Sequence, residues 1–194
     1  MNTIVPIVRQ ALVLFAALTV ICGVAYPLAT AGIGQLAFSH EVNGSMVERG
    51  GKPVGSSLIG QSFTSPKYFW GRPSATAPMA NNGAGSGGSN QGPTNPALVD
   101  AVKARIAALK ELDPGNTRAI PVDLVTASGS GLDPEISLAA AIYQAPRVAR
   151  VRGLPLAQVE NAIAKAQKTA YIGFFGEARV NVLELNLALD AMQK

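Results

Sequence analysis

The side chains that perform most enzymatic chemistry are scarce in this sequence. It contains one cysteine, Cys22, and one histidine, His40, within 194 residues. A zinc site takes several Cys, His or carboxylate ligands, and a Ser/His/Asp triad requires a histidine as its base. Cys22 lies inside a long apolar stretch and His40 directly follows it, so we interpret His40 as a polar residue at the boundary. The sequence therefore indicates no metal centre, no disulfide and no catalytic residue.

Two glycine-rich segments have the composition of phosphate-binding loops. Residues 83–88 reproduce the glycine spacing of a dinucleotide loop, but no strand is predicted before them and no apolar helix after them. Residues 126–134 stand between a strand predicted at 122–124 and a predicted helix, an arrangement that can present free backbone amides to an anion. A cap by Asp133 or Ser137 would compete with that anion, and an ordinary tight connection is the simpler interpretation. The nucleotide hypothesis would use Ser128, Gly129, Ser130 and Gly131.

Aromatic and basic side chains form a third group of candidates. Tyr68-Phe69-Trp70 directly precedes Gly71-Arg72-Pro73. The cluster is interpreted either as an anchor of the domain core or as a protein interface, where Trp, Tyr and Arg are enriched. Three arginines, at 147, 150 and 152, follow Pro146; their default interpretation is a solvated helix face, with a docking surface for an acidic partner as the alternative. The candidate partner-contact residues are Tyr68, Phe69, Trp70, Arg72, Arg147 and Arg150.

A long uncharged stretch must position everything that follows it. Residues 11–39 carry no charge and are dense in Leu, Val, Ile, Phe and Ala. A bilayer core of about 30 Å needs about 20 apolar residues in a helix, so we predict a transmembrane helix at residues 10–38 after a short tail at 1–9. Pro27 would loosen one backbone hydrogen bond and kink the helix. Small side chains at near-helical spacing could allow close packing of helices in lipid, although alanine is simply common here: Cys22, Ala25, Ala29 and Gly32.

The charges beside this stretch predict its orientation. Arg9 precedes it and Glu41 follows it. Because basic residues stay in the cytoplasm, the tail is predicted inside the cell and the main domain outside. A cleaved signal peptide is the alternative, with Ala29-Thr30-Ala31 as a small-x-small cleavage site. Apolar character continues to Phe38 and exceeds the apolar region of about 7–15 residues that is usual in a signal, which favours a retained anchor.

Residues 40–194 remain for one small soluble domain, which we predict to be of the α+β class. A hairpin is expected within residues 45–63, around Gly50-Gly51, and a long flexible Gly/Ser/Asn-rich loop at 76–95. A helix is predicted to begin at Asn95-Pro96 and end at 113–115. Later helices are expected from about residue 134, bent or broken at Pro146, then at about 156–166, and at 180–189, where the alternating leucines also fit a strand.

The overall composition excludes one class of partner. The sequence is 48% hydrophobic and 14% charged, with a net charge of +4. Its basic residues are dispersed among acidic ones and form no basic block. Nucleic-acid binding is therefore not expected.

Several segments together resemble the C chain of the Kdp potassium-transporting ATPase of bacteria. They follow in the same order across nearly the whole chain, and the amino-terminal anchor agrees. Trp70 stands at a position where that family accepts varied residues. The segments are GSSLIGQ at 55–61, YF at 68–69, GRPSA at 71–75, SGGSN at 86–90, LVTASGSGLD at 124–133, Gln144, PRVA at 146–149 and VNVLELNLALD at 180–190.

The resemblance implies a non-catalytic accessory subunit of an ATP-driven potassium uptake pump in the bacterial inner membrane. It implies three partners: a channel-like potassium-translocating chain, a P-type ATPase chain and a very small fourth subunit. It also implies a catalytic chaperone that raises the ATP affinity of the pumping chain, so ATP is suggested as a ligand by resemblance only. With the domain outside the cell, that effect would have to pass through the membrane chains. The alternatives are a cytoplasmic domain that binds ATP directly and, ranked last, an anchored extracytoplasmic enzyme.

Overall fold

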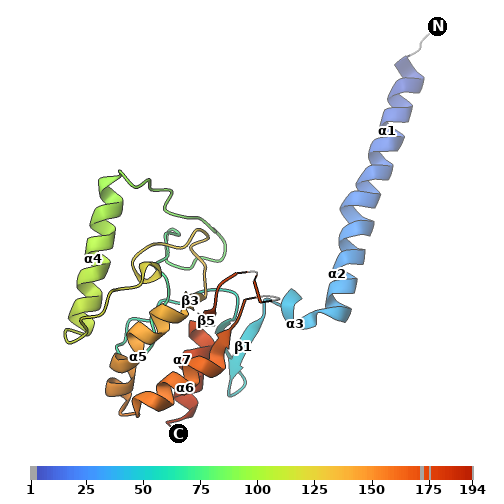
Figure 1. Ribbon diagram of the computed structural model, residues 1–194. Helices are drawn as coiled ribbons and strands as arrows, with labels where there is room; N and C mark the ends of the chain where they lie inside the picture. Colours follow the sequence, from blue (N-terminus) through green and yellow to red (C-terminus); the bar gives the residue numbers. More distant parts are fainter. Residues whose placement is uncertain (1–3, 171–172, 175, 194) are drawn as a thin grey trace. The chain divides into compact units, whose positions relative to one another are not determined.

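The computed structural model describes residues 4–170, 173–174 and 176–193. It divides into two compact units, residues 1–46 and 47–194. The first is helical and apolar, and the second is a small domain of helices and short strands (Figure 1). The predicted α+β class with one amino-terminal apolar helix is confirmed.

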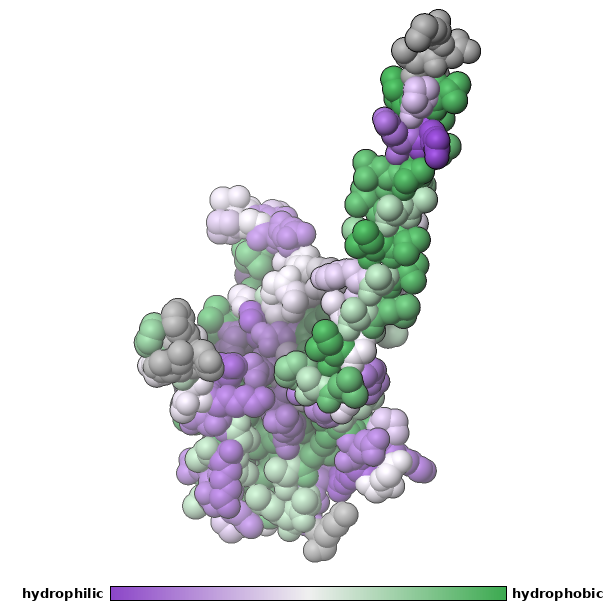
Figure 2. Space-filling view, turned by 90° about the vertical axis from the view of Figure 1, so that its right-hand side faces the viewer, coloured by the Kyte–Doolittle hydropathy of each residue, from purple (hydrophilic) through white to green (hydrophobic). Residues whose placement is uncertain are grey.

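The first unit consists mainly of one long helical segment. It contains α1 (Ile4–Val20), the π-helical turn η1 (Ile21–Ala25), α2 (Tyr26–Ala37) and the short α3 (Ser39–Val42). Val5–Ala37 is long and apolar enough to cross a membrane. Apart from a polar band near its amino-terminal end, its visible face in Figure 2 is apolar. The helix thus begins six residues before the span predicted from the sequence.

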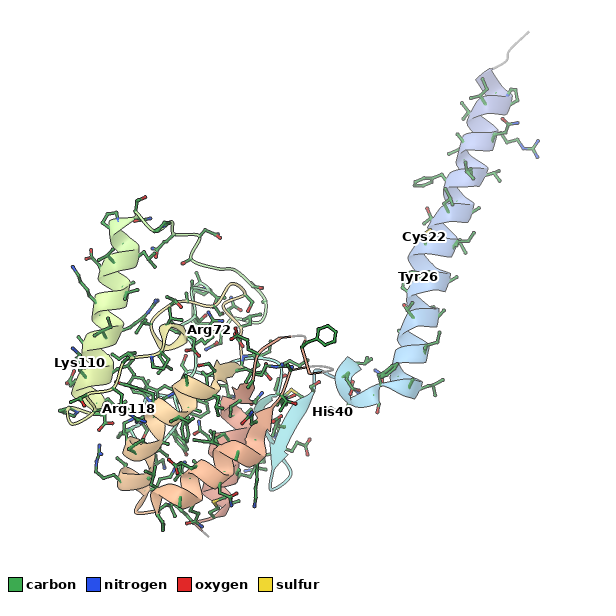
Figure 3. The ribbon with its side chains drawn as sticks, in the orientation of Figure 1. Cys22, Tyr26, His40, Arg72, Lys110 and Arg118 are labelled. Carbon is green, nitrogen blue, oxygen red and sulfur yellow. The ribbon has the colours of Figure 1, made fainter. Side chains whose placement is uncertain are left out.

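The π-helical turn lies just before Pro27, with Tyr26 between them. Proline has no N–H, so the carbonyl of Gly23, four residues earlier, loses its usual donor. At the end of η1 the Tyr26 N–H donates to the carbonyl of Ile21, five residues back. Such single π turns are a known way for a helix to absorb an irregularity. The helix therefore widens just before the proline, in a turn that contains Cys22; Figure 3 labels Cys22 and Tyr26.

The predicted hairpin is confirmed. Strands β1 (Met46–Arg49) and β2 (Lys52–Ser56) pair in a two-stranded sheet. Gly50 and Gly51 connect them with φ angles of 60° and 74°. Two consecutive residues of positive φ define the type I′ turn, whose twist matches that of paired strands, and glycine reaches this conformation without a steric cost.

A second sheet was not expected from the sequence. Its order is β3 (Glu135–Ser137), β5 (Arg179–Asn181), β4 (Gln167–Lys168), with both pairs antiparallel. Ile136 faces Val180 across the central pair, and both side chains are buried. Strands of two or three residues are too short to give an alternating pattern, which explains why the sequence did not reveal them.

The strand predicted at 122–124 is wrong: Val122–Leu124 is the 3₁₀ turn η2. The N–H of Leu124 donates to Pro121 O at 3.1 Å, which is the three-residue bonding of such a turn. The Asp123 carboxylate accepts from the Ser137 N–H at 2.7 Å and from its hydroxyl at 3.1 Å. The turn therefore fixes the end of β3 and is not part of a sheet.

Four helices complete the domain: α4 (Pro96–Leu112), α5 (Leu138–Arg152), α6 (Leu156–Ala166) and α7 (Val182–Ala191). The side chains of Asn95, Ser137 and Asn181 cap three of them by accepting backbone N–H groups of the first turn. Figure 1 shows α5, α6 and α7 beside β3 and β5, with α4 to one side, from which Leu109 reaches the core. The predicted helices at 96–112, 156–166 and the leucine-rich end are confirmed. The one expected from residue 134 begins later, because 135–137 pair as β3.

The predicted break at Pro146 is wrong, since α5 continues through it. Pro146 has no N–H for the carbonyl of Ile142, four residues earlier. The Arg118 guanidinium replaces that donor: Nη1 donates to Ile142 O at 3.1 Å and Nη2 to Tyr143 O at 2.7 Å. A distant arginine therefore satisfies the carbonyl that proline leaves without a helical partner.

The core lies between α5, α6, α7 and the three-stranded sheet, with Phe69, Leu109, Leu124 and Val125 contributed from outside these elements. The largest of its fully buried apolar side chains are Phe69, Ile136, Ile163, Leu185, Leu189, Val148, Val159 and Val180.

Candidate functional site

Residues 68–70, the aromatic segment, are held by two side-chain amides. The Phe69 N–H donates to Asn186 Oδ1 at 2.8 Å, and Asn186 Nδ2 donates to Phe69 O at 3.0 Å. Gln144 binds the next residue in the same way: Trp70 N–H donates to Oε1 at 2.9 Å, and Nε2 donates to Trp70 O at 3.0 Å. A carboxamide offers the same donor and acceptor as a peptide group, so these two side chains substitute for a neighbouring strand.

Arg147 completes this arrangement from α5. Its guanidinium donates to the carbonyls of Pro66 and Tyr68, the latter at 3.0 Å, and to Gln144 Oε1 at 2.7 Å. It also lies 5.8 Å from the centre of the Trp70 ring. Burial lowers the pKa of Arg147 to about 10, which still leaves the side chain charged at neutral pH. A buried cation is thus stabilised by carbonyl and amide oxygens. We call Gln144, Arg147 and Asn186 the clamp.

The default interpretation of the three arginines as a solvated face is wrong for two of them. Arg147 is 2% exposed and Arg152 is 8% exposed. They lie on the inner side of α5 because their donors reach backbone carbonyls of residues 66–68. Arg150 is exposed as expected, and it forms an ion pair of 2.6 Å with Asp113.

Asp190 on α7 joins the clamp region to the hairpin. Its carboxylate pairs with Arg49 at 2.8 Å and with Arg152 at 2.9 Å, and the Tyr68 hydroxyl donates to it at 3.4 Å. Arg152 also donates from Nε to Lys67 O at 2.7 Å. One carboxylate therefore connects β1, the aromatic segment, α5 and α7.

The substitution Asp190→Asn should make the free energy of unfolding less dependent on pH in the acidic range. Burial favours the neutral acid, but the hydrogen bonds and charges of Arg49 and Arg152 outweigh it and lower the pKa of Asp190 below its ordinary value of 3.8. A lowered folded-state pKa stabilises the fold above the unfolded pKa, and this contribution is lost as the pH falls through the folded value. We expect the variant to be less stable than the wild type by about 1–2 kcal/mol at pH 7, with the difference shrinking below about pH 4.

Urea unfolding of the full chain in detergent at pH 7 and pH 3 measures this difference. Asp100→Asn, at an exposed position on α4, is the control and should change stability by less than about 0.5 kcal/mol. A difference between Asp190→Asn and the wild type that is the same at both pH values would contradict the prediction.

The structure places the candidate partner-contact residues in different environments. Phe69 is fully buried and Arg147 nearly so, so both side chains are used inside the domain. Tyr68 and Trp70 are half-buried, and with Phe69 and Arg147 they form one group. Arg72, labelled in Figure 3, lies beyond this group, where Nη1 pairs with Asp133 at 3.0 Å.

The serine–glycine loop, residues 126–133, is bonded to the loop that faces it, residues 73–88. The Ser128 N–H donates to Pro73 O at 3.1 Å, and the Gly87 N–H donates to Ser130 O at 2.8 Å. The Ser74 hydroxyl donates to Gly131 O at 2.6 Å. Part of the predicted flexible loop is therefore fixed against the candidate nucleotide residues.

Gly131 lies at the closest approach of these two loops. Its φ is +67°, and a Cβ atom there would lie 2.6 Å from both Gly87 O and Thr76 Cγ2. Ser128 and Gly131 are buried, whereas Gly129 and Ser130 are exposed. The loop is followed by β3, and α5 begins only at Leu138. β3 therefore separates the loop from the helix start, and of the two predicted caps Ser137, not Asp133, caps the helix.

The small side chains of the apolar helix and the possibility of a metal site remain to be described. Cys22, Ala25, Ala29 and Gly32 are exposed on the outside of the apolar helix, and their packing role remains a prediction. Within the described residues, no group of three or more His, Cys, Asp or Glu side chains could hold a metal ion.

The clamp itself was missed by sequence reasoning. Gln144 and Asn186 stood in segments that carried the family resemblance, but no role was assigned to them. A signal was present at Asn186, which interrupts the leucines of α7 and is 2% exposed. A polar residue among apolar helix positions usually has a buried partner, and here that partner is the backbone of Phe69.

Comparison with known proteins identifies the family. A family model described as "K+-transporting ATPase, c chain" matches residues 8–191. The chain belongs to the KdpC family. It is 68% identical over 182 residues to the potassium-transporting ATPase KdpC subunit of Janthinobacterium sp. (strain Marseille), covering 94% of this chain and 96% of that one.

Other relatives agree over similar lengths. The KdpC subunit of Polaromonas naphthalenivorans is 65% identical, with 96% of this chain and 95% of that one covered. The KdpC subunit of Ralstonia nicotianae is 61% identical, with 96% and 92% covered. A KdpC-family chain is a subunit of a potassium-transporting ATPase complex. In the described part of this chain one amino-terminal helix, Val5–Ala37, is long and apolar enough to cross a membrane, which indicates association with the membrane.

Proposed function

We propose that this KdpC-family chain is a non-catalytic accessory subunit of a potassium uptake pump, needed for assembly and activity of the complex. It is anchored by one transmembrane helix in the bacterial inner membrane, with its domain on the periplasmic side. Its partners there are the channel-like potassium-translocating chain, the P-type ATPase chain and the small fourth subunit. Arg9 before the apolar helix and Glu41 after it support this orientation.

The contacts of the serine–glycine loop are the observation that carries the non-catalytic role. Backbone and hydroxyl groups of this loop bond to residues 73–88, and β3 separates the loop from α5. A phosphate cradle at a helix start uses the free amides of the first helical turn, and here β3 lies between the loop and that turn. We therefore assign the loop to packing. An influence on ATP affinity would then be a coupling transmitted through the partner chains.

The candidate contact surface is the half-buried or exposed part of the partner-contact set: Tyr68, Trp70, Arg72 and Arg150. The clamp fixes the backbone beside the two aromatic residues, so they are presented without a large loss of conformational entropy. Preorganised Tyr, Trp and Arg side chains are the residue types that contribute most to binding at interfaces.

Cysteine labelling tests the orientation. In a Cys22→Ala background, Ser130→Cys places a thiol at an exposed loop position, and Thr3→Cys places one on the other side of the apolar stretch in the sequence. A maleimide that does not cross the inner membrane should label Ser130→Cys in intact cells and should label Thr3→Cys only after lysis.

The reverse pattern would contradict the periplasmic domain and support direct binding of ATP from the cytoplasm. Loss of the Thr3 region from the purified protein would instead indicate a cleaved signal peptide. Potassium-limited growth of each variant strain serves as the control that the labelled chain is in a working complex.

A further inference from the structure

A pocket of about 250 Å³ opens between α4, η2 and the segments at 61–64 and 70–74. Two arginines line it, Arg72 and Arg105, and none of the described residues that line it is acidic. This volume is near the lower end of small-molecule pockets, about 300–1,000 Å³. It therefore suits a small ligand and not a macromolecular segment.

Arg105 supplies the pocket's uncompensated charge. It lies on α4 and donates from Nη1 to Val125 O at 2.8 Å, but it forms no ion pair within the described part of the chain. A guanidinium carries five N–H donors, and the single bond to Val125 O leaves most of them for other acceptors. Half-burial of a cation without a carboxylate costs free energy that an anionic ligand would recover.

Arg72 adds donors from the opposite wall. Its Nη1 pairs with Asp133, while Nη2 reaches Ala127 O only at 3.5 Å. Its buried Nε has no hydrogen-bond acceptor among the described residues. The guanidinium is thus held in place with its hydrogen-bonding capacity incompletely used.

The remaining lining combines hydroxyls with an apolar wall. Ser62 Oγ accepts from Asn81 Nδ2 at 3.2 Å, which leaves its own hydrogen to donate, and Thr64 stands beside it. Phe63, Trp70 and Leu109 provide apolar surface. Convergent donors against aromatic and aliphatic walls are the usual composition of a small-molecule site.

From this combination we propose that the pocket binds a small organic anion, a compound with a carboxylate or phosphate group and an apolar or planar body. The anionic group accepts from Arg105, Arg72 and the hydroxyls, and the body packs against Trp70 and Phe63. This site adjoins the clamp through Trp70 and the serine–glycine loop through Arg72, and it requires no catalytic step.

Isothermal titration of the full chain in detergent with benzoate and with inorganic phosphate tests the proposal, with sodium chloride at equal ionic strength as the blank. Trp70 fluorescence gives a second readout, because Trp70 is the only tryptophan and lines the pocket. We expect saturable binding of at least one probe. Arg105→Gln, which keeps a donor for Val125 O, should weaken it at least about tenfold, as expected for a lost charge-assisted contact.

Lys103→Gln is the matched control, since it removes the same charge from an exposed position on the same helix, and it should change binding less than about twofold. Thr64→Val is a second variant that preserves side-chain volume and should weaken binding about threefold. Absence of saturable binding up to about 50 mM, or equal weakening by Arg105→Gln and Lys103→Gln, would overturn the proposal. A third outcome would also overturn the proposal: the wild type binds neither probe, and the Arg105→Gln variant no longer copurifies with the pump. Arg105 would then pair with a carboxylate of a partner subunit and not with a small anion.

Discussion

Replacement of Arg147 by methionine should lower the free energy of unfolding by about 3–5 kcal/mol. The guanidinium is 2% exposed and bonds to Pro66 O, Tyr68 O and Gln144 Oε1. Methionine fills much of the volume but donates no hydrogen bond, so Pro66 O and Tyr68 O would lose this donor, whereas Gln144 Oε1 would keep the Trp70 N–H. Urea unfolding of the full chain in detergent, followed by far-UV circular dichroism, measures the change.

Arg150→Met is the matched control, because it removes the same group three residues later on the same helix. The Arg150 side chain is 60% exposed, but its partner Asp113 is buried, so loss of this one ion pair should cost about 1–2 kcal/mol, less than loss of the Arg147 contacts. Equal losses in the two variants would mean that the hydrogen bonds of Arg147 do not stabilise the domain. Arg147→Lys keeps the charge without the planar fork and should recover only part of the stability.

Replacement of Gly131 by alanine should cost about 2–4 kcal/mol. A left-handed backbone conformation costs a non-glycine residue about 1–2 kcal/mol. The new methyl group would add a clash, because its position lies 2.6 Å from Gly87 O, which is a backbone atom in the facing loop. The two loops would then have to separate. The same unfolding experiment reports the loss of stability.

Gly129→Ala tests whether the effect belongs to that one position. It lies in the same loop, and its Cβ would meet nothing within 4 Å. We expect a change smaller than about 0.5 kcal/mol. If both variants left stability unchanged and both abolished stimulation of ATP hydrolysis in the assembled pump, the packing role assigned to the serine–glycine loop would be wrong.

Local signals explain which elements were predictable from the sequence. Gly50-Gly51 implied a tight turn and Asn95-Pro96 a helix start, and both features depend on residues adjacent in the chain. The apolar helix was also predictable, because a long run of apolar residues is enough to indicate it. The sheet of β3, β5 and β4 was not, since pairing of Ile136 with Val180 joins strands more than forty residues apart.

The errors have a common physical origin in long-range hydrogen bonds. Pro146 should end a helix by local rules, but Arg118 supplies the missing donor from outside. Arginine is usually a surface residue, but Arg147 is buried because it donates hydrogen bonds to the carbonyls of Pro66 and Tyr68. The candidate pocket was also missed, because Arg72 and Arg105 belong to separate segments that only the fold brings together.

The clamp also requires a fixed number of residues in the aromatic segment, residues 68–70. Asn186 on α7 hydrogen-bonds to the N–H and carbonyl of Phe69, and Gln144 on α5 hydrogen-bonds to those of Trp70. A residue inserted or deleted within 68–70 would move the backbone N–H and carbonyl groups that follow it, so that at least one of the two amides would lose its hydrogen bonds. Conservative exchanges of side chain there are tolerable as long as the count of residues is preserved, so the segment works as a spacer of fixed length between α5 and α7.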